Sequence, residues 1–209
     1  MSDILELDEI TEIIKEKIME DNVKDFNDII TFKNASDREV FLSAIMDGTG
    51  YYVDNCIRYW NKYDDEHNIP IEERKPIKIY IDSVGGSLLD TFIMIDSIKL
   101  SKTPVWTIAL GCVYSGGFFT FIVGHKRFAY NHASFLYHEG SITVGGTAGQ
   151  FENQSAFYKR QLAQLKDIVT QNTSITEEEY ETIKKDDVWY TVEDGIEKGF
   201  VDEIMKEFI

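Results

Sequence analysis

The sequence has few cysteines. Only Cys56 and Cys112 occur among its 209 residues, far apart and beside apolar neighbours. Their spacing fits neither a zinc site nor a disulfide framework. We therefore expect two reduced, packed thiols, and the sequence predicts neither a metal site nor a cofactor.

Positive charge is also scarce. The chain has 21 basic residues against 37 acidic ones, which gives a formal net charge of -16. Such a charge opposes the phosphate backbone of nucleic acid and the anionic face of a membrane. We expect neither nucleic acid nor a membrane as a partner.

Long apolar runs are missing. The first residues, Met1 to Glu6, lack both the positive segment and the apolar segment of a secretory signal. No apolar run approaches the length of a membrane span. These patterns predict a cytoplasmic protein, or one that a virus makes inside a cell.

The apolar content is nevertheless sufficient for a substantial core. Hydrophobic residues make up 43% of the chain and aromatic residues 13%, which fits one domain with an extension. Residues 1–33 are charged and carry apolar residues at helical spacing, so we expect an N-terminal amphipathic helical extension there. It would be either a surface helix of the domain or a docking element. The main domain would then occupy residues 34–209.

Strand-like and helix-like patterns alternate in the main domain. The expected order is a strand at 39–43, a helix at 51–63, a solvated polar connection at 64–75, a strand at 78–82, a glycine turn at 83–87 and a helix at 88–100. The helix at 51–63 is expected to bury Tyr52, Cys56 and either Tyr59 or Trp60. This alternation of strands and helices predicts an α/β fold with a largely parallel sheet.

Ser115 stands between an apolar strand-like run at 105–110 and an apolar helix-like run at 118–123. A serine at such a junction can cap the helix, and serine is a preferred capping residue. It can also be an exposed nucleophile. On this stretch alone, capping is the simpler interpretation.

Other candidate residues follow from their positions. Gly85 and Gly86 form a turn whose backbone N–H groups could bind a phosphate or an oxyanion, although the lysine of a P-loop is missing and a plain turn is the alternative. His138 ends a short strand at 134–137, where it could transfer a proton. Asp186 and Asp187 precede an aromatic strand-like run, and either could orient a histidine or be solvated.

Five segments resemble motifs of one protein family, and they follow one another in the same order as in that family. They are Ile79 to Gly86, Gly111 to Gly116, Phe135 to His138, Gly149-Gln150, and Asp187 to Asp202. The chain resembles the proteolytic subunit of the Clp protease family, the ClpP-like serine peptidases, over about residues 37–204. The resemblance implies a ClpP/crotonase-like spiral of βα units with a protruding handle helix at about 150–172.

The resemblance also implies an active site. Ser115 would be the nucleophile, His138 the general base and Asp187 the residue that orients the histidine. The backbone N–H groups of Gly86 and Gly116 would form the oxyanion hole. The chain departs from the family at Gly116, where a larger residue such as methionine is usual.

The implied function is a serine endopeptidase acting on unfolded or flexible polypeptides inside a homo-oligomeric ring. The family implies a heptamer, alone or stacked as a tetradecamer, and an AAA+ unfoldase as a partner. Two alternatives stay open on the sequence. One is a crotonase-like acyl-CoA enzyme, and the other is a catalytically silent ring or scaffold component.

Overall fold

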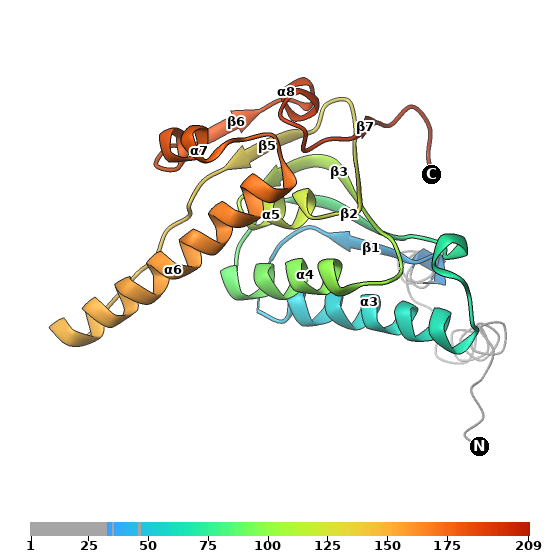
Figure 1. The fold of residues 1–209 in the computed structure, drawn as a ribbon, viewed down its shortest axis with the longest axis horizontal. Coiled ribbons are helices and arrows are strands. Elements are labelled where there is room, and N and C mark those ends of the chain that lie inside the picture. The colour runs from blue at the N-terminus through green and yellow to red at the C-terminus, as the bar shows by residue number, and fades with distance from the viewer. Residues whose placement is uncertain (1–32, 35, 46) are drawn as a thin grey trace, which may run out of the picture. The chain divides into compact units, whose positions relative to one another are not determined.

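A computed structural model describes residues 33–34, 36–45 and 47–209. The predicted extension at 1–33 falls, apart from Lys33, outside these residues. The chain divides into two units, Met1–Asp37 and Arg38–Ile209. Every labelled strand and helix in Figure 1 belongs to the second unit.

The strands of the second unit form one sheet. They are β1 (Glu39–Leu42), β2 (Ile77–Ser83), β3 (Val105–Tyr114), β4 (Lys126–Ala129), β5 (Ser134–Tyr137), β6 (Val188–Tyr190) and β7 (Glu203–Ile204). Their order is β1-β2-β3-β4-β7, while β5 pairs with β3 and with β6. Only the β5–β6 pair is antiparallel among the described strands. The predicted α/β fold with a largely parallel sheet is confirmed.

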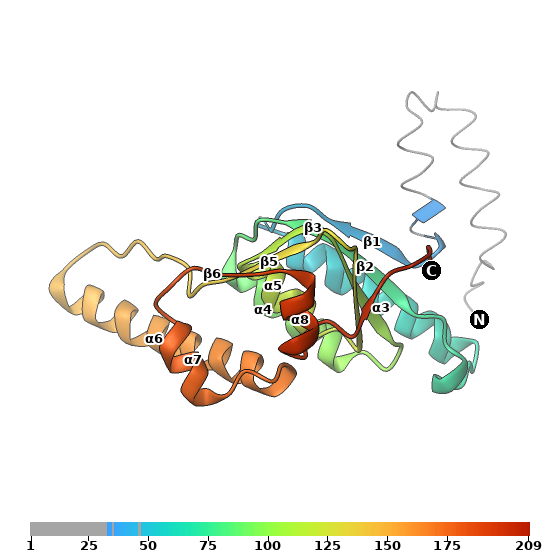
Figure 2. The ribbon, with the colours of Figure 1, turned by 90° about the horizontal axis from the view of Figure 1, so that it is seen from above.

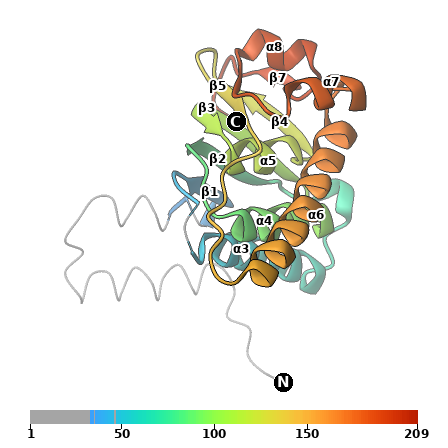
Figure 3. The same ribbon diagram turned by 90° about the vertical axis from the view of Figure 1, so that its left-hand side faces the viewer.

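Helices accompany the strands. They are α3 (Thr49–Glu66), α4 (Leu88–Leu100), α5 (Gly116–Ile122), α6 (Ala148–Asn172), α7 (Glu177–Ile183) and α8 (Val192–Glu197), with a short 3-10 turn at Ile71–Glu73. Figures 1 and 2 show α3 and α4 side by side on one side of the strands. In Figures 1 and 2 the N-terminal end of α6 lies far from the strands, as expected for the handle helix, and in Figure 3 this end faces the viewer.

An aromatic cluster joins α5 to the last strands. The Phe118 ring lies 5.3 Å from the Phe200 ring, and the Phe121 ring lies 5.2 Å from that of Phe135 in β5. Every residue of α5 is buried, which explains why its sequence is apolar on all sides. The cluster therefore holds the helix after Ser115 against the strand before His138.

The predicted buried face of the first helix is confirmed for Trp60, while Cys56 is only half-buried and the prediction is wrong for Tyr52 and Tyr59. Helix α3 buries Val53, Ile57 and Trp60, whereas Tyr52 is 51% exposed and Tyr59 is 47% exposed. Two faces of this helix carry apolar residues at helical spacing, and packing against α4 selects the one with Val53, Ile57 and Trp60. Tyrosine tolerates partial exposure because its ring ends in a hydroxyl.

The predicted solvated connection at 64–75 is also corrected. Asp64 is fully buried and receives hydrogen bonds from Arg38 at 2.5 and 2.8 Å and from Thr103 at 2.7 Å. Arg74 is buried as well and donates to Asp65. Burial alone would raise the pKa of Asp64, but the hydrogen bonds from Arg38 and Thr103 and the nearby arginine charges hold it below its ordinary value.

We predict that Asp64→Ala lowers the free energy of unfolding by about 3–5 kcal/mol, because it leaves the buried Arg38 charge unpaired. Urea denaturation at neutral pH measures the loss. The wild-type contribution of Asp64 is present above pH 3.8, the ordinary value for this carboxyl, and is lost as the pH falls through the lower folded pKa.

The control for this prediction is Glu66→Ala. Glu66 forms an ion pair with Lys62 on the surface of α3. Removing a surface pair of this kind should change the free energy of unfolding by at most about 0.5 kcal/mol. Equal losses for the two variants would contradict the role of the buried pair.

Candidate active site

Ser115 lies in a strained turn between β3 and α5. Its φ is 53° and its ψ is -121°, a left-handed φ that residues other than glycine seldom adopt. Ser115 occupies the N-cap position of α5, but its side chain accepts no hydrogen bond from the helix. By contrast, Ser87, Thr147 and Thr191 do cap α4, α6 and α8. The capping interpretation of Ser115 is therefore wrong for the hydroxyl.

The backbone ties Ser115 to the strand that precedes His138. The Ser115 N–H donates to the Leu136 carbonyl at 2.9 Å. Strands β3 and β5 pair in parallel with Tyr114 opposite Leu136. Ser115 therefore lies at the carboxyl ends of these strands, the edge where α/β sheets place their sites.

His138 and Asp187 face each other because of strand register. Leu136 pairs with Trp189 and Tyr137 with Val188 in the antiparallel β5–β6 pair. One further step along the register sets His138 opposite Asp187 rather than Asp186. The His138 Nδ1 atom lies 3.4 Å from Asp187 Oδ1, and the two side chains are 32% and 64% exposed.

Ser115 and His138 are joined through the backbone of β5 and not through their side chains. Among the described residues, no hydrogen bond links Ser115 Oγ to the His138 ring. Such catalytic hydrogen bonds are often long in proteases without substrate and tighten in the complex. The structure thus brings His138 to Asp187 directly and sets Ser115 at the end of the adjoining strand.

The remaining histidines lie away from Ser115 and Asp187. The His67 ring bonds to the Tyr63 carbonyl and stacks on the Tyr63 ring. His125 Nδ1 accepts the Val105 N–H at 2.8 Å, and burial lowers the pKa of this ring. His132 lines a hollow near the C-terminal residues. These contacts involve neither Ser115 nor Asp187.

The glycine turn after β2 packs directly on Ser115. Gly85 has a φ of +92°, and a Cβ placed on it would lie 2.7 Å from the Ser115 Cβ. Gly86 has a φ of +150°, and a Cβ there would lie 1.9 Å from the Ile45 carbonyl oxygen. Both positions need glycine, because conformation and space each exclude a side chain.

Two free amides lie beside Ser115. A Cβ on Gly116 would be 3.6 Å from the Gly86 nitrogen, so the two residues are neighbours in space. Within the described part of the chain, neither the Gly86 N–H nor the Gly116 N–H has a hydrogen-bond acceptor. Paired free donors next to a hydroxyl have the arrangement that an oxyanion hole requires.

Thr91 and Ile45 fill the space next to Gly116. A Cβ on Gly116 would approach Thr91 Oγ1 to 2.5 Å and Ile45 Cδ1 to 3.1 Å. A larger residue, as the family resemblance would suggest at this position, therefore fits only if the side chains of Thr91 and Ile45 shift. We did not single out Thr91, Asp90 or Ile45 from the sequence, although Asp90 and Thr91 stand out as polar residues in the apolar run of α4.

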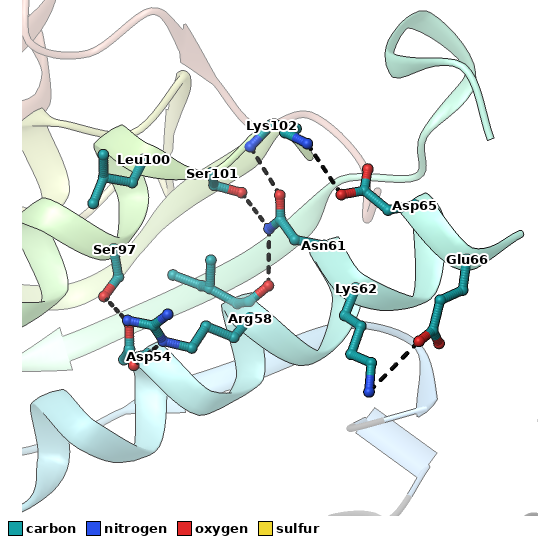
Figure 4. Close-up of a pocket in the computed structure, with 11 residues that line it drawn as sticks. Asp54, Arg58, Asn61, Lys62, Asp65, Glu66, Ser97, Leu100, Ser101 and Lys102 are labelled. Atoms are coloured by element: carbon teal, nitrogen blue, oxygen red, sulfur yellow. Dashed lines mark hydrogen bonds and ion pairs between the residues drawn. The ribbon is translucent and has the colours of Figure 1, made fainter. Parts of the chain in front are cut away.

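A hollow of about 600 Å³ lies elsewhere, between α3 and the end of α4. Its polar groups are paired: the Asn61 side chain donates to the Ser101 hydroxyl and accepts the Lys102 backbone N–H, and the Ser97 hydroxyl donates to Asp54 (Figure 4). It includes no candidate catalytic residue. In the part of the chain that the structure describes, no cluster of acidic, histidine or cysteine side chains could hold a metal, and no helix could span a membrane.

Comparison with known proteins identifies the family of the chain. The family model for Clp protease matches residues 70–208. The chain belongs to the Clp protease family. The match includes the glycine turn at 83–87 and the segments that carry Ser115, His138 and Asp187. Strand β1 and helix α3 lie outside it. Family membership supports a peptidase.

Individual relatives are similar at a modest level. Proteolytic subunit 2 of the ATP-dependent Clp protease from Rhodococcus jostii is 32% identical over 136 residues, which cover 63% of this chain and 68% of that protein. Subunit 1 from Corynebacterium jeikeium is 32% identical, with 63% and 71% covered. Subunit 1 from Streptomyces avermitilis is 33% identical over 140 residues, with 65% and 63% covered.

We predict that Gly85→Ala lowers the free energy of unfolding by at least about 1 kcal/mol, because the left-handed backbone and the contact with Ser115 both oppose a methyl group. Urea denaturation measures the change. Gly145→Ala is the control, since a Cβ on Gly145 would have no neighbour within 4 Å. A Gly85→Ala protein as stable as Gly145→Ala would contradict the close contact.

Proposed function

We propose that the protein is a serine endopeptidase that hydrolyses peptide bonds of unfolded or flexible polypeptides. The observation that carries this proposal is the strained Ser115 turn, which has free Gly86 and Gly116 amides beside it and ends next to the strand before His138. The similarity to Clp protease proteolytic subunits supports it.

The proposed mechanism assigns one role to each side chain. Ser115 Oγ attacks the scissile carbonyl carbon while the His138 ring takes the hydroxyl proton. Asp187, which lies beside Nδ1 of His138, keeps the proton on that nitrogen and leaves Nε2 to act as the base. The protonated ring then gives its proton to the leaving amine, and an acyl-enzyme forms.

The second half of the reaction reverses these roles. His138 takes a proton from water, the resulting hydroxide attacks the acyl carbon, and Ser115 regains its proton as the acid product leaves. In both halves the carbonyl oxygen becomes negative and accepts the Gly86 and Gly116 N–H groups. Each such donor is worth about 3 kcal/mol of transition-state stabilisation.

The proposal includes a homo-oligomeric ring of seven subunits, stacked in pairs, that works in the cytoplasm with an AAA+ unfoldase. Exposed apolar side chains on α4 and α6 support assembly. Leu89 and Leu100 of α4 are 65% and 81% exposed, and Phe151 and Phe157 of α6 are 54% and 53% exposed. Apolar surface of this kind is typical of protein interfaces.

We predict that Ser115→Ala lowers kcat for a fluorogenic peptide by at least about 10⁴-fold, because it removes the attacking oxygen. The same variant should lose covalent labelling by a serine-directed phosphonate. Ser101→Ala is the control, since its hydroxyl bonds to Asn61 and the Thr103 carbonyl in the hollow of Figure 4. Assembled wild-type protein that neither turns over peptide nor labels would refute the enzyme proposal and favour a scaffold.

We predict that Asp187→Asn lowers kcat on the order of 10³- to 10⁴-fold, because the amide no longer holds the required tautomer of His138. Asp186→Asn should leave kcat nearly unchanged, since strand register sets Asp187 opposite His138. Steady-state kinetics on both variants decide the assignment. The reverse pattern would transfer the orienting role to Asp186.

A further inference from the structure

The turn that carries Gly86 is held by a separate segment. Ile45, which is almost fully buried, forms an isolated parallel bridge with Gly86. The Ile45 N–H donates to the Gly85 carbonyl at 3.2 Å, and the Ser87 N–H donates to the Ile45 carbonyl at 2.8 Å. The direction of the Gly86 N–H therefore depends on where Ile45 lies.

Asp90 of α4 accepts hydrogen bonds from the start of α3 and from Ser87 in the glycine turn. Its Oδ1 accepts the N–H groups of Gly48 and Gly50 at 3.0 and 2.8 Å. Its Oδ2 accepts the Ser87 hydroxyl at 2.7 Å. The residue is 6% exposed. One carboxylate thus joins the start of α3 to Ser87, the residue that follows Gly86 and bonds to Ile45.

The start of α3 lies very close to Asp90. Helix α3 begins after Gly48, whose side of the helix has no side-chain cap, and Asp90 of α4 accepts the N–H groups of Gly48 and Gly50 instead. A Cβ on Gly50 would lie 2.6 Å from the Asp90 carbonyl oxygen, so only glycine allows this approach. The close contact cannot form with another residue at position 50 unless the backbone moves.

The contacts also favour the ionised form. The hydrogen bond from Ser87 and those from the Gly50 and Gly48 amides hold the pKa of Asp90 below its ordinary value. A carboxylate therefore stands there at neutral pH. Hydrogen bonds to an ionised acceptor are roughly twice as strong as those between neutral groups.

We propose that Asp90 is a positioning residue for the oxyanion hole, which acts through Ile45 and Ser87 to keep the Gly86 N–H aligned with that of Gly116. Asp90 itself touches no reacting atom. The inference rests on the proposed peptidase function. It adds a residue from outside the predicted triad and oxyanion pair to the machinery that aligns the site.

Asp90→Asn tests the role with little change of shape. Its amide nitrogen cannot accept the Ser87 hydroxyl, and the negative charge is lost. We expect kcat to fall about 10- to 100-fold while KM stays unchanged, because full loss of one oxyanion donor costs about 10²- to 10³-fold. Binding of a peptide boronate, whose adduct places an oxygen in the oxyanion hole, should weaken by a similar factor.

Matched variants separate positioning from general stability. Asp54→Asn also removes a carboxylate that accepts a serine hydroxyl, from Ser97, but in the hollow of Figure 4. It should lower stability and leave both kcat and boronate affinity unchanged. Ser87→Ala should match Asp90→Asn, whereas Ser87→Thr keeps the hydroxyl and should recover most of the kcat that Ser87→Ala loses.

Hydrogen exchange gives a readout that does not need activity. In Asp90→Asn the Ile45 and Ser87 amides should exchange faster, while the amides of β3 keep their wild-type rates. Unchanged exchange, kcat and boronate affinity in Asp90→Asn would overturn the inference. If Ser115→Ala shows that the chain is no serine peptidase, the proposed function fails, and exchange at Ile45 and Ser87 still decides whether Asp90 holds the turn.

Discussion

The structure around Ser115 depends on the contact between two turns that only glycine permits. The turn after β2 touches Ser115 through Gly85, and the Ile45 carbonyl presses against Gly86 on the other side. Parallel pairing of β2 and β3 brings both turns to the same edge of the sheet. The Gly86 and Gly116 N–H groups and the Ser115 hydroxyl lie together because three backbone segments meet there. They can approach so closely because glycine has no Cβ atom.

Strand β5 joins the two halves of the proposed site. On one side its Leu136 carbonyl accepts the Ser115 N–H, and on the other its antiparallel pairing with β6 brings Asp187 to His138. The ring of Phe135 packs on Phe121 and Phe200 behind this strand. This apolar core fixes the position of β5 and of the polar residues at its end. His138 and Asp187 are exposed, so the register of β5 and β6, rather than burial, places them opposite each other.

Two buried carboxylates hold opposite ends of α3. Asp90 accepts the amides at its N-terminal end, and Asp64 near its C-terminal end accepts hydrogen bonds from Arg38. Helix α3 lies outside the residues that match the family model. These two aspartates link α3 to residues that match the family model, Asp90 through Ser87 and Asp64 through Thr103, and Asp90 does so next to the proposed oxyanion hole.

Local patterns in the sequence determined the order of strands and helices, the glycine turn and the junction at Ser115, because hydrophobic spacing and glycine conformation depend on near neighbours. The family resemblance supplied the proposed roles of His138 and Asp187. Tertiary structure alone decided which face of α3 is buried and that Asp64 is paired. It also decided that the Ser115 hydroxyl caps nothing and that Asp90 bonds to Gly48. These outcomes depend on partners 26 residues away for Asp64 and 42 residues away for Asp90, and no local periodicity specifies such distant contacts.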